Sequence, residues 1–402
     1  MRISGKLGMA LAVALLATAG APAFAKDKAD DSDKISEAIG PSLSAAQTAM
    51  TKKDYPTALT NLDKAEPIAK TPYEHFLIGM WRAISGQSLK NDATFNAGLD
   101  EVVTSGYAKK PDVTAQFALI SGQNAYNAKN YDKAIQRLQL AQQLGSTEPN
   151  LVPLIAESYI ASNRTAQGMA VYEKMYTDSA AAGKPMPQDM MVRARTTAND
   201  ARLDSDVQKW SIRLVQSYPS PTMWHDLIIL YIQSHPKLSF QATVDLYRLM
   251  RATHSFKENP TLSEYAGDLV DKLGLPGEAK AAIDQARTDG VITTMSADMS
   301  SLYNTASAKI PGDKASLRAT AATPRAARGN GDGWFSYGDY AKALTLYNQA
   351  KGKPGIEPDG INMRIGMAQA LSGDKANAKA SFASVGGEEA DIAKFWSLYV
   401  SS

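Results

Sequence analysis

The chain of 402 residues contains no cysteine, and that absence removes several classes of protein at once. There can be no disulfide framework, no thiolate metal site and no lipid-modified N-terminal cysteine. Histidine is also scarce, and the four that occur are too far apart in sequence to pair as metal ligands on one helix turn. They are His75, His225, His235 and His254. We therefore expect no metal centre and no cofactor.

Motifs for catalysis are missing as well. No G-x-S-x-G occurs, and no carboxylate pair suggests a general acid and base. The glycine-rich run 329–333 (GNGDG) lacks a preceding strand, a following Lys-Ser/Thr and the carboxylates of an EF-hand loop. We interpret this run as a flexible connection between repeats, and we expect a protein that is not an enzyme. An alternating strand pattern is also absent, which argues against sheet-containing folds.

Long apolar runs are missing except at the beginning of the chain. Arg2 and Lys6 precede a short apolar stretch, Leu7 to Leu16, and Ala23-Phe24-Ala25 matches a small-x-small cleavage signature. This pattern predicts a signal peptide, 1–25, cleaved after Ala25, and a periplasmic or secreted protein. The apolar run is too short for a membrane anchor, and a charged leader, 26–34, follows it. Without a twin-arginine pair, export is expected to be Sec-type.

An excess of one charge is absent too. The formal net charge is +2, from 43 basic and 41 acidic residues, and loss of Arg2 and Lys6 with the signal peptide brings it to zero. A neutral chain offers little electrostatic attraction to nucleic acid or to an anionic membrane. We therefore expect neither as a partner, and no integral membrane segment after the signal is removed.

The strongest pattern that is present lies in 115–144, where apolar and small residues recur at three- and four-residue steps. The pattern is broken once, at Lys129 and Asn130, which predicts two short amphipathic helices joined by a tight turn. The residues in phase are Ala118, Gly122, Ala125, Tyr126, Tyr131, Ala134, Ile135, Leu138 and Ala141.

This pair of helices resembles the tetratricopeptide repeat (TPR). Gly122, Ala134, Leu138 and Ala141 fall on repeat positions 8, 20, 24 and 27. The same phase returns at Gly168, 34 residues after Ala134, and in a unit that Pro260 opens, with Gly267, Ala279, Ile283 and Ala286. Trp224, Leu227 and Tyr231 stand in the W-x2-L-x3-Y arrangement of TPR first helices. The resemblance implies an all-α fold, an α-solenoid of TPR-like helix-turn-helix repeats.

The strength of the pattern divides the chain. Residues 35–287 are expected to form an N-terminal TPR-like array, although Gly98 makes the second helix of the unit 73–103 doubtful. In 288–333 the pattern thins, which indicates an irregular repeat or a hinge. Residues 334–402 are expected to add C-terminal repeats and a capping helix.

The resemblance also nominates residues for binding, since first helices of TPR arrays line a concave groove. Along the array, the side chains that line the groove would change from amide and aromatic to apolar and then to acidic. Such a lining suits an extended peptide or an amphipathic helix. For Tyr126 and Ile232, packing between neighbouring helices is an equally good interpretation. The candidates are Gln116, Gln123, Tyr126, Asn127, His225, Ile229, Gln233, Glu264, Asp268 and Asp271.

We therefore expect a non-catalytic scaffold of the bacterial envelope that binds a protein or peptide partner of unknown identity. One alternative is a binder of envelope glycan or another small ligand, with Trp224, Tyr126 and Trp334 as stacking surfaces. Another is an enzyme, or a non-catalytic subunit of an envelope enzyme complex. Self-association is a further possibility, because terminal repeats of solenoids can stack on one another.

Overall fold

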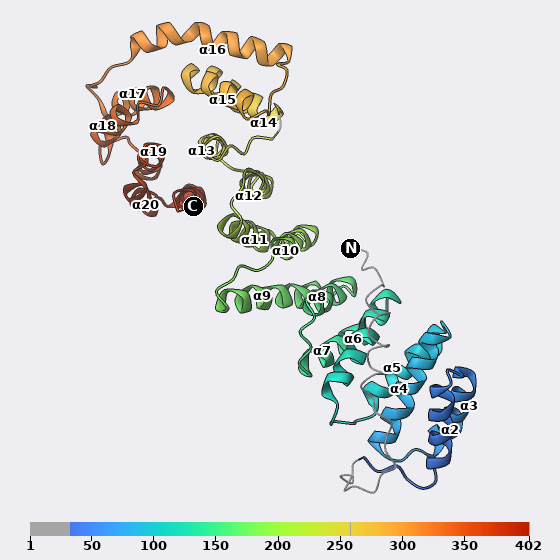
Figure 1. The fold of residues 1–402 in the computed structure, drawn as a ribbon. Helices are drawn as coiled ribbons and strands as arrows, with labels where there is room; N and C mark the ends of the chain where they lie inside the picture. The colour runs from blue at the N-terminus through green and yellow to red at the C-terminus, as the bar shows by residue number, and fades with distance from the viewer. Residues whose placement is uncertain (1–32, 258, 402) are drawn as a thin grey trace. The chain divides into compact units, whose positions relative to one another are not determined.

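The protein is described by a computed structural model that covers residues 33–257 and 259–401. The expected signal peptide, 1–25, and all but the last two residues of the leader lie outside the described residues. Within them the chain forms 20 α-helices and no strand, which confirms the all-α helical-repeat fold (Figure 1). The helices belong to two compact units, Met1–Met186 (unit 1) and Pro187–Ser402 (unit 2). No helix of the described part is long and apolar enough to cross a membrane.

Unit 1 consists of four helical hairpins, each pairing two helices that follow one another in sequence. The hairpins are α2 (Gly40–Thr51) with α3 (Tyr55–Ala65), α4 (Pro72–Ser88) with α5 (Asp92–Thr104), α6 (Pro111–Asn127) with α7 (Tyr131–Gln143), and α8 (Leu151–Ala161) with α9 (Thr165–Ala181). A short 3-10 turn, η2 (Glu66–Ile68), follows α3.

Unit 2 continues the same hairpin plan with one long helix in the middle, α16, which packs against α14 and α15. Its helices are α10 (Gln188–Asp200), α11 (Asp204–Ser217), α12 (Pro221–Ser234), α13 (Phe240–Ala252), α14 (Asn259–Asp271), α15 (Pro276–Thr288), α16 (Ala297–Ser316), α17 (Pro324–Ser336), α18 (Tyr340–Ala350), α19 (Pro358–Leu371), α20 (Lys375–Ala383) and α21 (Ala390–Tyr399), with a 3-10 turn, η3 (Gly387–Glu389), before α21.

Several of the turns inside the hairpins are built in the same way as the turn between α6 and α7. Lys129 has a positive φ of 61°, and its N–H donates to Tyr126 O while that of Asn130 donates to Ala125 O. This pair of bonds is the Schellman ending of a helix. The side chain of Asn130 then accepts from the backbone N–H of Lys133 and starts α7. Two residues therefore end one helix and begin the next.

Glycines set the spacing of several hairpins. The second helix of the unit 73–103, which Gly98 makes doubtful in the sequence, is present, because α5 runs through Gly98. A Cβ on Gly98 would lie 2.3 Å from the backbone N of Ala83, and one on Gly86 2.3 Å from the backbone N of Phe95. The backbones of α4 and α5 are thus in direct contact. Gly122 is similarly tight against Leu138, whereas a Cβ on Gly267 would meet nothing within 4 Å.

The run 329–333 is not the flexible connection that its composition predicts. It lies inside α17, where a Cβ on Gly331 would come within 2.6 Å of the Tyr347 ring and one on Gly333 within 2.4 Å of Leu317. Between them, Asp332 accepts a hydrogen bond from the Tyr347 hydroxyl at 2.9 Å. The glycines here make room for large neighbours of α17 and do not break the helix.

Unit 2 closes on itself, since its last helix returns to α12 and α13 (Figure 1). Trp396 of α21 donates from Nε1 to the backbone oxygen of Asp245 at 3.1 Å. Phe395 packs edge-on against Tyr231, with ring centroids 5.1 Å apart. The C-terminal helix therefore covers α20 and also joins residues more than a hundred positions earlier in the sequence.

Candidate functional site

A cleft of about 470 Å³ runs along α6 in unit 1. One wall is a single stripe of α6, with Gln116, Leu119 and Gln123 spaced by three and four residues. The connection from α7 to α8 forms the other wall, from Leu144 to Glu148. Gln116 and Gln123 are half-buried, so that their amides are accessible at the edge of an apolar floor. Such a lining offers hydrogen bonds to a backbone and a surface for apolar side chains.

The opposite face of α6 is fixed by polar contacts. Ser121 donates to Asp100 Oδ1 of α5 at 3.1 Å, and Asn124 Nδ2 donates to Asn96 Oδ1 at 2.8 Å. Lys133 of α7 binds the same Asp100, with 2.5 Å between Nζ and Oδ2. The cleft is therefore carried by a helix that is held rigidly on its far side.

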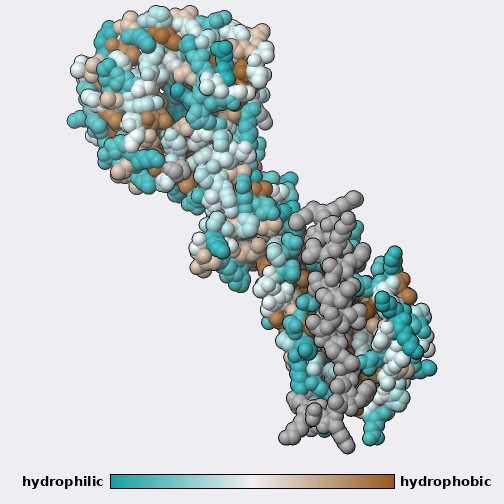
Figure 2. Space-filling view, viewed as in Figure 1, coloured by the Kyte–Doolittle hydropathy of each residue, from teal (hydrophilic) through white to brown (hydrophobic). Residues whose placement is uncertain are grey.

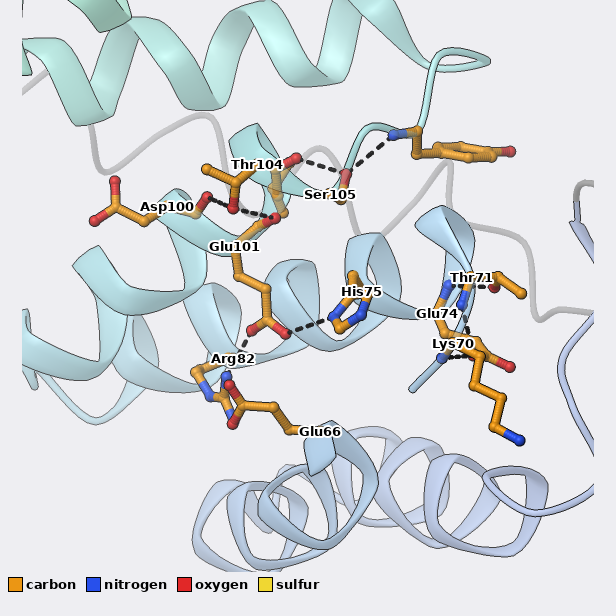
Figure 3. A network of polar contacts seen from close by, with 12 residues as sticks. Glu66, Lys70, Thr71, Glu74, His75, Arg82, Asp100, Glu101, Thr104 and Ser105 are labelled. Atoms are coloured by element: carbon orange, nitrogen blue, oxygen red, sulfur yellow. Dashed lines mark hydrogen bonds and ion pairs between the residues drawn. The ribbon is translucent and has the colours of Figure 1, made fainter. Parts of the chain in front are cut away.

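A buried ionic network fixes the hairpin before α6 (Figure 3). The Arg82 guanidinium donates to Glu101 at 2.5 Å, Glu66 at 2.7 Å and Asp63 at 3.1 Å. Burial raises the pKa of Glu101, and the charge of Arg82 opposes that rise. His75 lies 3.7 Å from the other oxygen of Glu101 and is well exposed. Three carboxylates around one arginine join α3, α4 and α5, which is a structural role.

The remaining candidates on α6 and α12 do not extend this cleft. Tyr126 is half-buried against Tyr131, with ring centroids 5.7 Å apart, and Asn127 is exposed at the end of α6. His225 is half-buried, and its Nδ1 lies 3.0 Å from Ser255 O. Ile229 is half-buried and Gln233 is exposed. None of these side chains lines the cleft along α6.

The acidic candidates of α14 are mostly engaged within unit 2. Glu264 accepts a hydrogen bond from the Tyr247 hydroxyl at 3.1 Å. Asp268 is 9 % exposed and forms an ion pair with Lys272 at 2.7 Å. Asp271, at the end of the helix, is exposed. The predicted acidic end of a groove is thus partly neutralised by contacts inside the unit.

A second pocket, of about 710 Å³, lies in unit 2, is open to solvent and is polar. We call it the chamber. Helices α13, α16, α17 and α19 and the turn before α21 contribute to its lining. Carboxylates outnumber cations there. The carboxylates are Asp313, Asp332, Glu357, Asp359, Glu388 and Glu389, and the cations are Lys272, Arg328 and Arg364.

Most of these charges have partners. Arg364 donates from Nε to Asp332 at 2.9 Å, from one terminal nitrogen to Gln241 at 3.1 Å and from the other to the backbone of Gly360 at 3.1 Å. Glu389 differs, because its Oε2 atom is buried without a hydrogen-bond partner among the described residues. Burial and then the charge of Asp245 raise the pKa of Glu389 from 4.5 to about 7.

Behind the chamber lies a fully buried ion cluster. Arg248 of α13 binds Glu278 with two bonds of 2.9 Å each and Asp245 with one of 3.0 Å. Tyr265 donates its hydroxyl proton to Glu278 at 2.7 Å. Although burial raises the pKa of Glu278, the charge of Arg248 brings it below its usual range. The cluster ties α13 to α15.

The aromatic residues considered for glycan stacking are occupied. Trp224 is 4 % exposed and lies against Tyr399, with ring centroids 6.5 Å apart. Trp334 donates from Nε1 to Arg318 O at 3.0 Å, and Lys342 Nζ lies 4.0 Å from the centre of its ring. Trp224 is therefore not accessible for stacking on a sugar, and Lys342 covers one face of the Trp334 ring.

Large apolar side chains are scattered over the surface that Figure 2 shows, among polar ones. The exposed large apolar residues of the described part are Ile68, Leu89, Leu203 and Phe240, which belong to different helices or turns. Among the described residues, no group of three or more His, Asp or Glu side chains is arranged to hold a metal ion.

Two parts of these sites could not be found from repeat positions. The wall from Leu144 to Glu148 belongs to a connection, and only the turn residue Gly145, with φ of 88°, marks it in the sequence. Arg364 donates a hydrogen bond to Gln241, and the charge of Asp245 raises the pKa of Glu389, although each pair is more than a hundred residues apart in the sequence.

Comparisons with known proteins add nothing to what the helices themselves show. No protein-family model matches the chain, and no curated protein sequence matches it. Among solved structures, a chain of "Structure of Naa15/Naa10 bound to HypK-THB" is similar, at 14% sequence identity and a TM-score of 0.20. The match covers 89% of this chain and 63% of that one. The protein is thus defined by its own helices as an all-α helical-repeat protein.

Proposed function

We propose that the chain is a non-catalytic interaction scaffold, a TPR-like solenoid of the bacterial envelope that binds a peptide or helical segment. The observation that carries the proposal is the cleft along α6, where Gln116 and Gln123 flank an apolar floor. Side-chain amides recognise backbone N–H and C=O groups, and Leu119 and Ile120 suit an apolar anchor. The location in the envelope rests on the signal-like beginning of the chain.

The support for a binding role is geometric. The cleft has the volume of sites that bind small ligands or a few peptide residues. Its floor helix is clamped from behind by Asp100 and Asn96, so a bound segment would meet a preorganised surface. The TPR register places Gln116 and Gln123 on the inward face of a first helix, which is where that family binds its ligands.

A peptide selection tests the proposal. A displayed random-peptide library is panned against the protein, and the selected peptide is titrated by calorimetry. The double substitution Gln116→Ala and Gln123→Ala is expected to weaken binding about tenfold or more, because each amide bond to a ligand contributes on the order of 1 kcal/mol.

The matched control is Gln136→Ala with Gln143→Ala, two exposed glutamines of α7 that do not line the cleft. This variant should bind as the wild type does. Failure of the library to yield any binder, or equal loss of affinity in both double variants, would remove the cleft as the binding site.

A further inference from the structure

The closure of unit 2 depends on a small joint between α21, with the η3 turn before it, and helices α13 and α19. Trp396 of α21 donates to the backbone of Asp245 there, while Phe395 and Tyr399 pack on Tyr231 and Trp224 of α12. Ser239, just before α13, donates its N–H to Glu388 of η3 at 2.6 Å. These contacts join segments about 150 residues apart in the chain, so the joint is held by packing and by hydrogen bonds between distant segments.

The charges at the joint are unbalanced around Glu389, the last residue of η3. Asp245 faces it from α13, Asp359 and Arg364 face it from α19, and Glu388 precedes it in its own turn. Arg364 is the cation that lowers the pKa of Glu389, and three of its five N–H donors bond to Asp332, Gln241 and Gly360. On α21 and α12, Lys394 and His235 act on Asp391 instead.

Two carboxyl oxygens at this joint have no partner among the described residues. They are Oε2 of Glu389 and Oδ2 of Asp245, and both atoms are buried. The other oxygen of Asp245 accepts from Arg248 and Gln241. A second negative charge beside Asp245 is unfavourable where water is excluded, whereas a neutral carboxyl group is tolerated.

We propose that this joint is a pH-sensitive latch, which docks α21 most tightly on α13 and α19 while Glu389 carries a proton and loosens when Glu389 ionises. Gly386, Glu388 and Glu389 line the chamber, so loosening the latch removes part of its wall. The latch thereby changes the shape of the chamber. It is independent of the cleft along α6.

The direction of the pH dependence follows from comparing Glu389 in the closed and in the open latch. In the closed state burial, and then Asp245, raise the pKa of Glu389 from 4.5 to about 7. In the open state Glu389 is in water and titrates near its ordinary value. The proton therefore favours closure, which is strongest below pH 4.5 and weakens as the pH rises through 7.

Hydrogen exchange read by mass spectrometry tests the latch on the whole protein. Protection of the peptide 386–401 is measured between pH 5 and pH 8 and corrected for the intrinsic pH dependence of exchange. The protection factor is expected to fall on the order of tenfold across this range. In Glu389→Gln and Glu389→Ala, which cannot ionise, it should stay constant.

Glu357→Gln is the matched control, since Glu357 is an exposed carboxylate of the same chamber that does not act on Glu389. This variant should keep the pH dependence of the wild type. Peptides from α16 report whether each variant is folded. Constant protection in the wild type, or an undiminished fall in both Glu389 variants, would overturn the proposal.

Discussion

Single residues decide where the helices end. Among the described residues, six other than glycine have a positive φ, namely Lys53, Lys90, Lys129, Asn163, Arg202 and His254. For a residue with a Cβ this conformation costs about 1–2 kcal/mol. Each lies just after a helix, where a left-handed residue allows the chain to turn back tightly. The hairpins are therefore built at a local energetic cost, which packing of the two helices offsets.

The first prediction concerns Lys129. Lys129→Gly should stabilise unit 1 by about 0.5–1 kcal/mol, because glycine relieves the left-handed strain and only part of that gain is lost to chain entropy. The measurement is the midpoint of urea unfolding. Lys129→Ala is the control, since it removes the charge but keeps a Cβ. Equal stabilisation by alanine would mean that charge, and not backbone strain, is the cause.

The second prediction concerns the next residue. Asn130→Ala should destabilise unit 1 by about 1 kcal/mol, because the side chain caps α7 through the N–H of Lys133. Asn130→Asp keeps an acceptor at that position and should unfold within a few tenths of a kcal/mol of the wild type. A loss in the aspartate variant as large as in the alanine variant would contradict capping.

Many of the residues that end one helix and begin the next could be predicted from the sequence. The break at Lys129 and Asn130 identified a turn, since two polar residues interrupt the apolar spacing there. The sequence alone could not decide the structural role of a glycine, and the run 329–333 is an example. Glycine is favoured both in turns and where helices touch, and only the neighbours Tyr347 and Leu317 distinguish the two. Those neighbours come from tertiary structure.

At the scale of elements, close packing of α4 on α5 depends on three glycines, Gly79, Gly86 and Gly98. At each, an added Cβ would lie within 3.0 Å of the backbone of the facing helix. Backbone atoms cannot move aside as a flexible side chain does, so the helices would have to separate.

The third prediction compares two Gly→Ala substitutions in helices. Gly98→Ala should cost about 1–3 kcal/mol, since overpacking outweighs the better helix propensity of alanine. Gly267→Ala meets nothing within 4 Å and should stabilise α14 by about 0.5–1 kcal/mol. Urea unfolding measures both. The same sign in both variants would show that propensity, and not interhelical contact, dominates at Gly98.

The positions of most helices follow from periodicity, as in 115–144, because an amphipathic stripe needs only local spacing. The closure of unit 2 does not follow from it. Trp224 and Tyr231 fit a repeat pattern, yet they also contact Tyr399 and Phe395, a pairing that no local period encodes. Local spacing therefore predicted that Gln116 and Gln123 of α6 line one cleft. It did not predict the chamber, because the residues that line the chamber come from distant parts of the sequence.

At the scale of the whole molecule, each unit has its own buried arginine with several carboxylates. Arg82 serves unit 1, where Asp63 and Glu66 remain largely in water, with side-chain exposures of 70% and 50%. Arg248 serves unit 2, where Asp245 and Glu278 are 1% exposed. The consequences of losing the two arginines should therefore differ.

The fourth prediction tests this difference. Arg248→Met should destabilise unit 2 by about 3–5 kcal/mol, because two carboxylates stay buried without a counter-charge. Arg82→Met should cost less, since two of its three partners can be solvated. Hydrogen exchange resolved by peptide measures each unit separately. Loss of protection in the other unit, for either variant, would contradict the division into two units.

Acid should act on the same cluster in the direction opposite to its effect on the latch. Arg248 holds the pKa of Glu278 below its ordinary value of 4.5, although burial opposes this. A carboxyl group with a lowered pKa stabilises the fold above its ordinary pKa, and that stability is lost as the pH falls below it.

The fifth prediction is that the urea midpoint of unit 2 decreases between pH 5 and pH 3. In Glu278→Gln the midpoint should start lower and decrease less, because the charge has been removed at every pH. Glu264→Gln, at an exposed carboxylate of α14, should keep the full decrease. If the urea midpoint of Glu278→Gln decreases between pH 5 and pH 3 as much as that of the wild type, other carboxylates cause the decrease. With Glu278 requiring its charge and Glu389 requiring its proton, the closed form of unit 2 should be most stable near pH 5, between the two titrations.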